Sequence, residues 1–238
     1  MRNTLLIVQM GHPPEDIRHD FGEQPDWFRR ALGELGVHTQ VVSPFLGHAL
    51  PDVDVHAGAV ITGAWEMVTD RADWSERTGD WARAMVAAER PLLGVCYGHQ
   101  LMAHALGGVV DYHPGGSEVG RLPVTLHAAA KDDAFLGHLP ESFEAFLTHE
   151  QSVLVPPAGA TVLGRSDHDP HQILRYGPKA LSVQFHPEFT APLLDACLQR
   201  GAERHAAAGR DVAAMRARLG PTPESTDLLR RFAALAGL

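Results

Sequence analysis

The chain has 238 residues, of which 45% are hydrophobic and 21% are charged, so it is long enough to bury the core of a globular α/β domain. Its formal net charge of −9 argues against a nucleic-acid backbone as the main partner. The two cysteines, Cys96 and Cys197, have no paired spacing, which argues against a disulfide framework or a cysteine-based zinc site.

The chain begins directly with strand-forming residues and lacks the long apolar segment and cleavage site of a secretory signal. No apolar run approaches the ~20 residues that span a bilayer. Because so few cysteines without paired spacing also indicate a reducing compartment, we expect a cytoplasmic protein that binds neither membrane nor nucleic acid.

In the first half of the chain, apolar runs of strand length alternate with segments of helical period, which predicts βα units on a mostly parallel sheet. The predicted strands are Leu5 to Gln9, Val37 to Val42, Ala57 to Thr62 and the run from Pro91 into Cys96. The predicted helices are Asp26 to Leu35, Trp74 to Glu89 and Gly98 to Leu106. The segment Met10 to Gln24, rich in His, Pro, Gly and charge, is predicted to be a loop.

The second half changes pattern, because short β-type runs are separated by turns rich in Gly, Pro and Asp, which favours hairpins and antiparallel additions. These runs are Leu122 to His127, Ala145 to Thr148, Thr161 to Ser166, Ile173 to Tyr176 and Ala180 to Gln184. Helical period returns after Pro187. We expect one domain over residues 1–238, with C-terminal helices at about 209–238 packed on it.

The segment Pro91 to Gln100 reads as a buried strand, a tight turn and the start of a helix. Cys96 stands at the turn between Gly94 and Gly98, and glycine allows a sharp bend without a Cβ clash. This is the pattern of a nucleophile elbow, with cysteine in place of serine. The amides and dipole of the following helix favour an anion at that point, and therefore a reactive thiolate. Taken alone, the segment also fits an inert cysteine buried in a core strand.

A nucleophilic cysteine needs a base, and the base needs an acceptor that orients it. The tripeptide His186-Pro187-Glu188 follows the last predicted strand. If that strand ends beside the strand of Cys96, His186 lies over Cys96, because α/β folds build sites at the carboxyl ends of parallel strands. Alone, the tripeptide fits a turn with a surface carboxylate. Together with the glycine-flanked cysteine, it indicates a catalytic triad.

Two segments resemble the two signatures of class I (triad-type) glutamine amidotransferases: Gly94-Val95-Cys96-Tyr97-Gly98-His99-Gln100, followed by Gly107-Gly108, and His186-Pro187-Glu188-Phe189. The interval of 90 residues between the cysteine and the histidine is also similar to that family. The resemblance covers about residues 3 to 200 and includes stand-alone, GMP-synthase-glutaminase-like members. It implies a flavodoxin-like α/β fold, with a mostly parallel sheet flanked by helices and added antiparallel strands.

By position, the resemblance implies Cys96 as the nucleophile, His186 as the general base and acid, and Glu188 as the orienting carboxylate. It implies that the thiolate attacks a γ-glutamyl amide, that a thioester forms as ammonia leaves, and that water then releases glutamate. The substrate would be a small molecule, glutamine first of all.

The resemblance also implies an oxyanion hole and contacts to the substrate. One donor would be the amide of Tyr97, and the other an amide of the turn after the third strand, at Gly63 or Ala64. The residues implied to bind the substrate are Gln100, His149 and Ser152. From the residues alone, Gly63 also fits a structural turn and Gln100 a polar residue in the first turn of a helix.

No glycine-rich phosphate-binding pattern and no His-Glu-x-x-His pattern occur, so we expect no cofactor and no metal. Three functions compete. The first is an amidotransferase-like hydrolase, acting alone or with an ammonia-accepting synthetase partner, and the second is a peptidase of γ-glutamyl peptides such as glutathione. The third is a non-enzymatic relative, against which the complete triad argues. The loops Met10 to Gln24 and Asp111 to Gly120 are expected to decide between the first two.

Overall fold

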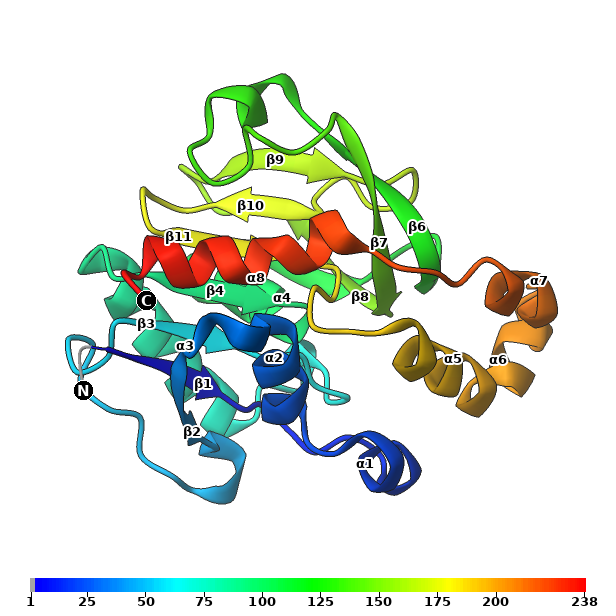
Figure 1. Cartoon of the computed structure of the whole chain (residues 1–238), viewed down its shortest axis with the longest axis horizontal. Helices are drawn as coiled ribbons and strands as arrows, with labels where there is room; N and C mark the ends of the chain where they lie inside the picture. The colour runs from blue at the N-terminus through cyan, green and yellow to red at the C-terminus, as the bar shows by residue number, and fades with distance from the viewer. Residues whose placement is uncertain (1–2) are drawn as a thin grey trace.

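The computed structural model describes residues 3–238 and contains a nine-stranded sheet that crosses the molecule (Figure 1). In spatial order its strands are β2 (His38–Val42), β1 (Thr4–Val8), β3 (Gly58–Ile61), β4 (Leu92–Val95), β11 (Ala180–Val183), β10 (Ile173–Arg175), β9 (Thr161–Arg165), β6 (Glu118–Leu126) and β7 (Ser142–His149). The first five are parallel, and the last four are joined by antiparallel pairing.

The parallel half has the strand order of flavodoxin-like sheets, 2-1-3-4-5, with β11 in the fifth place. The antiparallel strands extend this half on one side. The predicted fold class is therefore confirmed. Its consequence for function is that β4 and β11 are neighbours, with Val95 paired to Val183 at their carboxyl ends.

Two layers of helices cover the parallel strands. Because side chains of a strand alternate between faces, Leu5 and Ile7 of β1 pack in one core with α2 (Gln24–Leu32) and α8 (Pro223–Leu235). Leu6 and Val8 pack in a second core with α3 (Asp73–Ala87) and α4 (Tyr97–Ala105). Within residues 3–238, no helix has the length and apolarity needed to cross a membrane.

Four further helices lie beyond the carboxyl edge of the parallel strands (Figure 1). They are α1 (Glu15–Phe21), α5 (Ala191–Arg200), α6 (Ala202–Ala207) and α7 (Val212–Ala217). The apolar face of α5, with Leu194 and Leu198, packs against Trp27 of α2 and Phe189. This face joins the helices to the sheet at the end where a site is expected.

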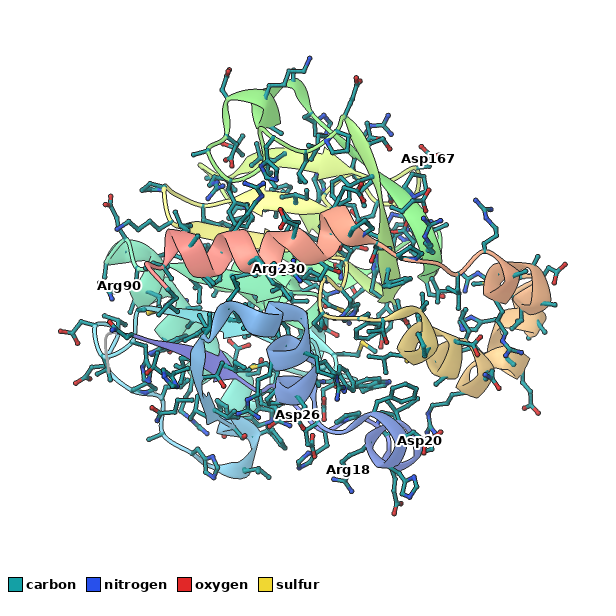
Figure 2. The ribbon with its side chains drawn as sticks, in the orientation of Figure 1. Arg18, Asp20, Asp26, Arg90, Asp167 and Arg230 are labelled. Carbon is teal, nitrogen blue, oxygen red and sulfur yellow. The ribbon has the colours of Figure 1, made fainter. Side chains whose placement is uncertain are left out.

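The prediction of a loop from Met10 to Gln24 is wrong, because α1 lies within it. The helix is short and only Ile17 is buried, so its sequence has no periodic apolar stripe from which a helix could be predicted. Arg18 and Asp20 point outward from it (Figure 2). Helix α2 also begins two residues earlier than predicted and ends at Leu32, since Glu23 and Asp26 form a capping box at its start.

The segment Asp111 to Gly120 is also more ordered than predicted. Its first residues belong to β5 (Val109–Tyr112), which pairs antiparallel with β8 (Gln151–Val155) in a separate two-stranded sheet. Its last residues belong to β6, which begins at Glu118 rather than at Leu122. These strands, and helix α6, lack the clean apolar alternation or period on which the prediction relied.

Candidate active site

The nucleophile elbow is formed where β4 ends at Val95 and α4 begins at Tyr97. Cys96, between them, has φ 50° and ψ −100°, a conformation that costs a non-glycine residue about 1–3 kcal/mol. Hydrogen bonds hold it there: the Cys96 amide donates to the carbonyl of Val183 over 2.9 Å, and the Gly98 amide donates to Thr62 over 3.2 Å.

The flanking glycines act differently from the prediction. Neither Gly94 nor Gly98 has a left-handed φ, so the bend lies at Cys96 itself. Instead, the glycines let the strand and the helix cross closely. A Cβ on Gly94 would lie 2.6 Å from the carbonyl oxygen of Gly98. A Cβ on Gly98 would overlap the carbonyl oxygen of Ile61. Both positions therefore need glycine because no Cβ fits between the strand and the helix.

His186 and Glu188 follow β11, the parallel neighbour of the Cys96 strand. Nδ1 of His186 lies 2.7 Å from Oε1 of Glu188, and their side chains are only 6% and 2% exposed. The ring of Phe189 stacks on the imidazole, with 4.0 Å between centroids. Among residues 3–238, no group hydrogen bonds Nε2 of His186. The imidazole is thus fixed on one side and free to exchange a proton on the other.

The charges around His186 favour its protonated form. Burial alone would lower its pKa, but the negative charges of Glu188 and of an ionised Cys96 outweigh burial and raise the pKa of His186 well above its ordinary value. The group therefore stays protonated at neutral pH when the thiolate is present. A protonated imidazole is the form that can give a proton to a leaving nitrogen.

The turn after β3 faces both groups. A Cβ on Gly63 would lie 3.0 Å from Cε1 of His186 and 3.6 Å from the Cβ of Cys96. Within the described part of the chain, the amides of Gly63, Ala64 and Tyr97 donate to no other group. The three predicted oxyanion donors therefore lie around the elbow with their amides unused.

Gln100, in the first turn of α4, is buried beside the elbow. Its side-chain nitrogen donates to the carbonyl of Gln151 over 2.6 Å and to Oε1 of Gln184 over 3.0 Å. Because both partners are acceptors, the side-chain nitrogen of Gln100 is used by the protein, and only its side-chain oxygen remains free to bind a substrate. That oxygen accepts no hydrogen bond from residues 3–238 and is a suitable acceptor for an ammonium group.

His149 is bound to the protein through both ring nitrogens. Nδ1 lies 2.9 Å from the carbonyl of Gln151, and Nε2 lies 3.0 Å from Oε2 of Glu118. One contact is to a backbone carbonyl and the other is to the Glu118 carboxylate, so the protein engages both ring nitrogens. The side chain has no nitrogen left for a substrate. Ser152 is fully buried, 3.4 Å from the same ring, and does not line the cavity described below.

Glu118, at the start of β6, is a residue that the sequence did not single out. Burial alone would raise its pKa, but the hydrogen bond and charge of His149 outweigh burial and hold the pKa of Glu118 below its ordinary value. The pair clamps the end of β7 to the start of β6. The carbonyl of Thr148, next to His149, lies 4.0 Å from Sγ of Cys96, so the clamp also fixes one wall of the site.

Replacing Glu118 with alanine is expected to lower the free energy of unfolding by about 3 kcal/mol, because it leaves the buried side chains of His149 and Gln172 without their acceptor. Denaturant unfolding measures this. The matched control is Glu144→Ala, which removes a partly exposed carboxylate of β7, 3.5 Å from Arg121. It should cost at most about 1 kcal/mol. Equal losses in the two variants would contradict this role of the Glu118 carboxylate.

A cavity of about 410 Å³ opens beside Cys96. His186, Glu188, Gln100 and His149 all line it, as do the residues of the predicted oxyanion hole. Apolar walls come from Trp27, Trp65 and Phe189. Among residues 3–238 there is no group of three His, Cys, Asp or Glu side chains placed to hold a metal ion.

The sheet order, the sharp turn at Cys96 and the His186–Glu188 pair are typical of α/β enzymes that carry a nucleophile on a turn from strand to helix. Within that class, the chain belongs to the glutamine amidotransferase class-I family, which it matches over residues 20–199. The family predicted from the two signatures is therefore confirmed.

The relatives span two activities. The chain is 34% identical to the glutamine-hydrolyzing GMP synthase of Aeropyrum pernix over 179 residues, which are 71% of this chain and 32% of that protein. It is 28% identical over 181 residues to γ-glutamyl peptidase 5 of Arabidopsis thaliana, covering 75% and 67% of the two chains. A glutamine amidotransferase structure from Thermotoga maritima has the same fold, with a TM-score of 0.76, 20% identity, and coverage of 98% and 99%.

Proposed function

We propose that the chain hydrolyses a γ-glutamyl amide through a thioester on Cys96. His186 carries the proton between the thiol and the leaving nitrogen, and Glu188 holds the imidazole in place. One observation carries the proposal: Nδ1 of His186 is bound to Glu188 at 2.7 Å, its Nε2 has no partner in the described chain, and His186 lines the same cavity as Cys96.

The proposed reaction has two halves. In the first, the thiolate attacks the amide carbon, and the carbonyl oxygen becomes an oxyanion bound by the amide of Tyr97 and one of the Gly63–Ala64 turn. The imidazolium of His186 then protonates the leaving nitrogen, the carbon–nitrogen bond breaks, and the thioester remains. In the second, His186 takes a proton from water, which attacks the thioester and releases glutamate and the free thiol.

The two relatives favour different leaving groups. The Aeropyrum relative hydrolyses glutamine by name, which supports glutamine as substrate here and release of ammonia. The chain spans about a third of that protein, so an ammonia-accepting synthetase, in the rest of a longer chain or as a partner, belongs to this proposal.

A γ-glutamyl peptidase is the second candidate. The Arabidopsis relative supports it by name and is covered over most of its length. The cavity supports it by size, because about 410 Å³ lies in the range of pockets that hold drug-sized ligands, roughly 300–1,000 Å³, and leaves room beyond a glutamine amide. In this reading, the leaving group is an amino acid or peptide instead of ammonia.

The test is to offer the purified chain glutamine, glutathione and γ-glutamyl dipeptides, and to measure the ammonia and glutamate released. We expect glutamate release from at least one of them. Ammonia from glutamine supports the first candidate, and peptide cleavage with little glutamine turnover supports the second. If no substrate releases glutamate, either alone or with a synthetase added, the proposed hydrolase is refuted.

A further inference from the structure

Two arginines stand on the wall of the cavity that α5 and α6 provide. Arg200 is the last residue of α5, Arg204 lies in α6, and both line the cavity. These helices lie beyond the carboxyl edge of the parallel strands (Figure 1). The turn between them is tight, because a Cβ on Gly201 would lie 2.7 Å from Nε2 of His205. The two arginines thus lie on adjoining helices, with side chains that are 49% and 64% exposed.

Each arginine uses only part of its hydrogen-bonding capacity. Nη1 of Arg200 donates to Asp16 of α1 over 2.5 Å, and Nη1 of Arg204 donates to Glu150. Within residues 3–238, Nε and Nη2 of both arginines donate to no other group. A guanidinium carries five N–H donors, and its Nε–Nη2 edge matches the two oxygens of a carboxylate. Both arginines therefore keep the edge that binds a carboxylate.

The reaction chemistry gives the direction of the leaving group. The leaving nitrogen must face Nε2 of His186 to receive its proton, while the carbonyl oxygen faces Tyr97 and the Gly63–Ala64 turn. Behind His186 lies Phe189, and α5 begins two residues later and packs on Phe189. A leaving group that extends beyond its nitrogen therefore extends on the side of α5, which ends at Arg200.

We propose that Arg200 and Arg204 bind the carboxylate of the leaving group, so that the substrates are γ-glutamyl amino acids or short γ-glutamyl peptides. This inference rests on the proposed thioester hydrolysis and narrows its substrate class. Of the acidic residues that line the cavity, Glu118 is paired with His149, Glu150 with Arg204 and Glu188 with His186, and Glu66 forms no ion pair within residues 3–238. The two arginines are specificity residues, and they take no part in bond breaking.

The test compares two substrates that differ only in the carboxylate: γ-glutamylglycine and γ-glutamylglycinamide. In Arg200→Ala and Arg204→Ala, KM for γ-glutamylglycine should rise about 10-fold in each, the effect of losing a hydrogen bond to a charged group, with kcat nearly unchanged. KM for the glycinamide and for glutamine should stay near the wild-type value. Arginine-to-lysine variants should recover part of the loss, and added salt should shrink the difference between substrates.

Two controls separate recognition from structure. Asp16→Asn removes the negative charge beside Arg200 and keeps the arginine, so it should leave KM for γ-glutamylglycine unchanged. Arg216→Ala removes an exposed arginine of α7 that lies outside the cavity and should do the same. If Asp16→Asn reproduces the loss, or if KM for glutamine rises as much as for the peptide, the arginines do not bind the leaving group.

Binding to the Cys96→Ala variant keeps this inference separate from the proposed function. Calorimetry with uncleaved γ-glutamylglycine reports Kd whether or not the wild type turns it over. The arginine substitutions should raise that Kd about 10-fold and leave the Kd of the glycinamide unchanged. Equal Kd values for the two ligands in the parent variant would overturn the inference, even if glutamine hydrolysis by the wild type is found.

Discussion

Cys96→Ala is expected to lower kcat by about 10⁶-fold, the size of effect found when the nucleophile of a triad is removed. The substitution removes the only atom that forms the proposed thioester, and no neighbouring group replaces it. Glutamate release from the substrate that the wild type cleaves best measures the loss. A loss of less than about 10-fold would contradict covalent catalysis by Cys96.

The same variant should keep its fold. Alanine retains the Cβ that the elbow already accommodates at φ 50°, and within residues 3–238 the Cys96 thiol makes a single, long hydrogen bond, 4.0 Å from the carbonyl of Thr148. Circular dichroism and thermal unfolding should therefore match those of the wild type. A large fall in unfolding temperature would mean that lost structure, and not lost chemistry, explains the lost activity.

Cys197 provides the matched control. It lies on α5 and lines the same cavity, and the partial burial of its thiol raises its pKa to about 12 and keeps it protonated at neutral pH. Cys197→Ala should therefore keep wild-type turnover. A glutamine analogue with an electrophilic ketone should label the wild type and Cys197→Ala once each, and should leave Cys96→Ala unlabelled. Labelling of Cys96→Ala at Cys197 would show that the two thiols have been confused.

The elbow and the His186–Glu188 motif were readable from the sequence because each is contained in a few consecutive residues. The proximity of the two motifs in space was also predictable, because each follows a strand and the two strands, β4 and β11, are parallel neighbours. The apolar runs in the first half of the chain predicted βα units on a mostly parallel sheet, whereas the flavodoxin-like fold was implied by the family resemblance. The triad roles themselves remain a prediction that the kinetic experiments test.

The surroundings of the triad were less readable, because they depend on residues far apart in sequence. Glu118 meets His149 only because β6 and β7 pair antiparallel, and no local pattern marks either as a buried polar residue. Helix α1 has too few buried residues to show a period. Arg200 and Arg204 read as ordinary basic residues of a helix surface until α5 and α6 are placed at the edge of the cavity.

Glu188→Gln is the second large effect expected, at about 100-fold or more in kcat, within the range of acid–base contributions. Glutamine keeps an oxygen that accepts a hydrogen bond from Nδ1 of His186, so the ring should stay near its place. It removes the negative charge that stabilises the imidazolium as His186 transfers its proton. The loss should therefore be smaller than that of Cys96→Ala. Equal losses in the two variants would show that the proposed roles are wrong.

The pH profile distinguishes this electrostatic role from a merely structural one. In the wild type, the charge of Glu188 raises the pKa of His186, so the protonated imidazole that the leaving nitrogen needs persists into alkaline solution. Removing the charge lowers that pKa, and the alkaline limb of kcat/KM should move to lower pH in Glu188→Gln. The surface variant Glu144→Gln should leave the limb unmoved. If Glu188→Gln loses rate without any shift of the limb, Glu188 holds the ring in position and does not tune its charge.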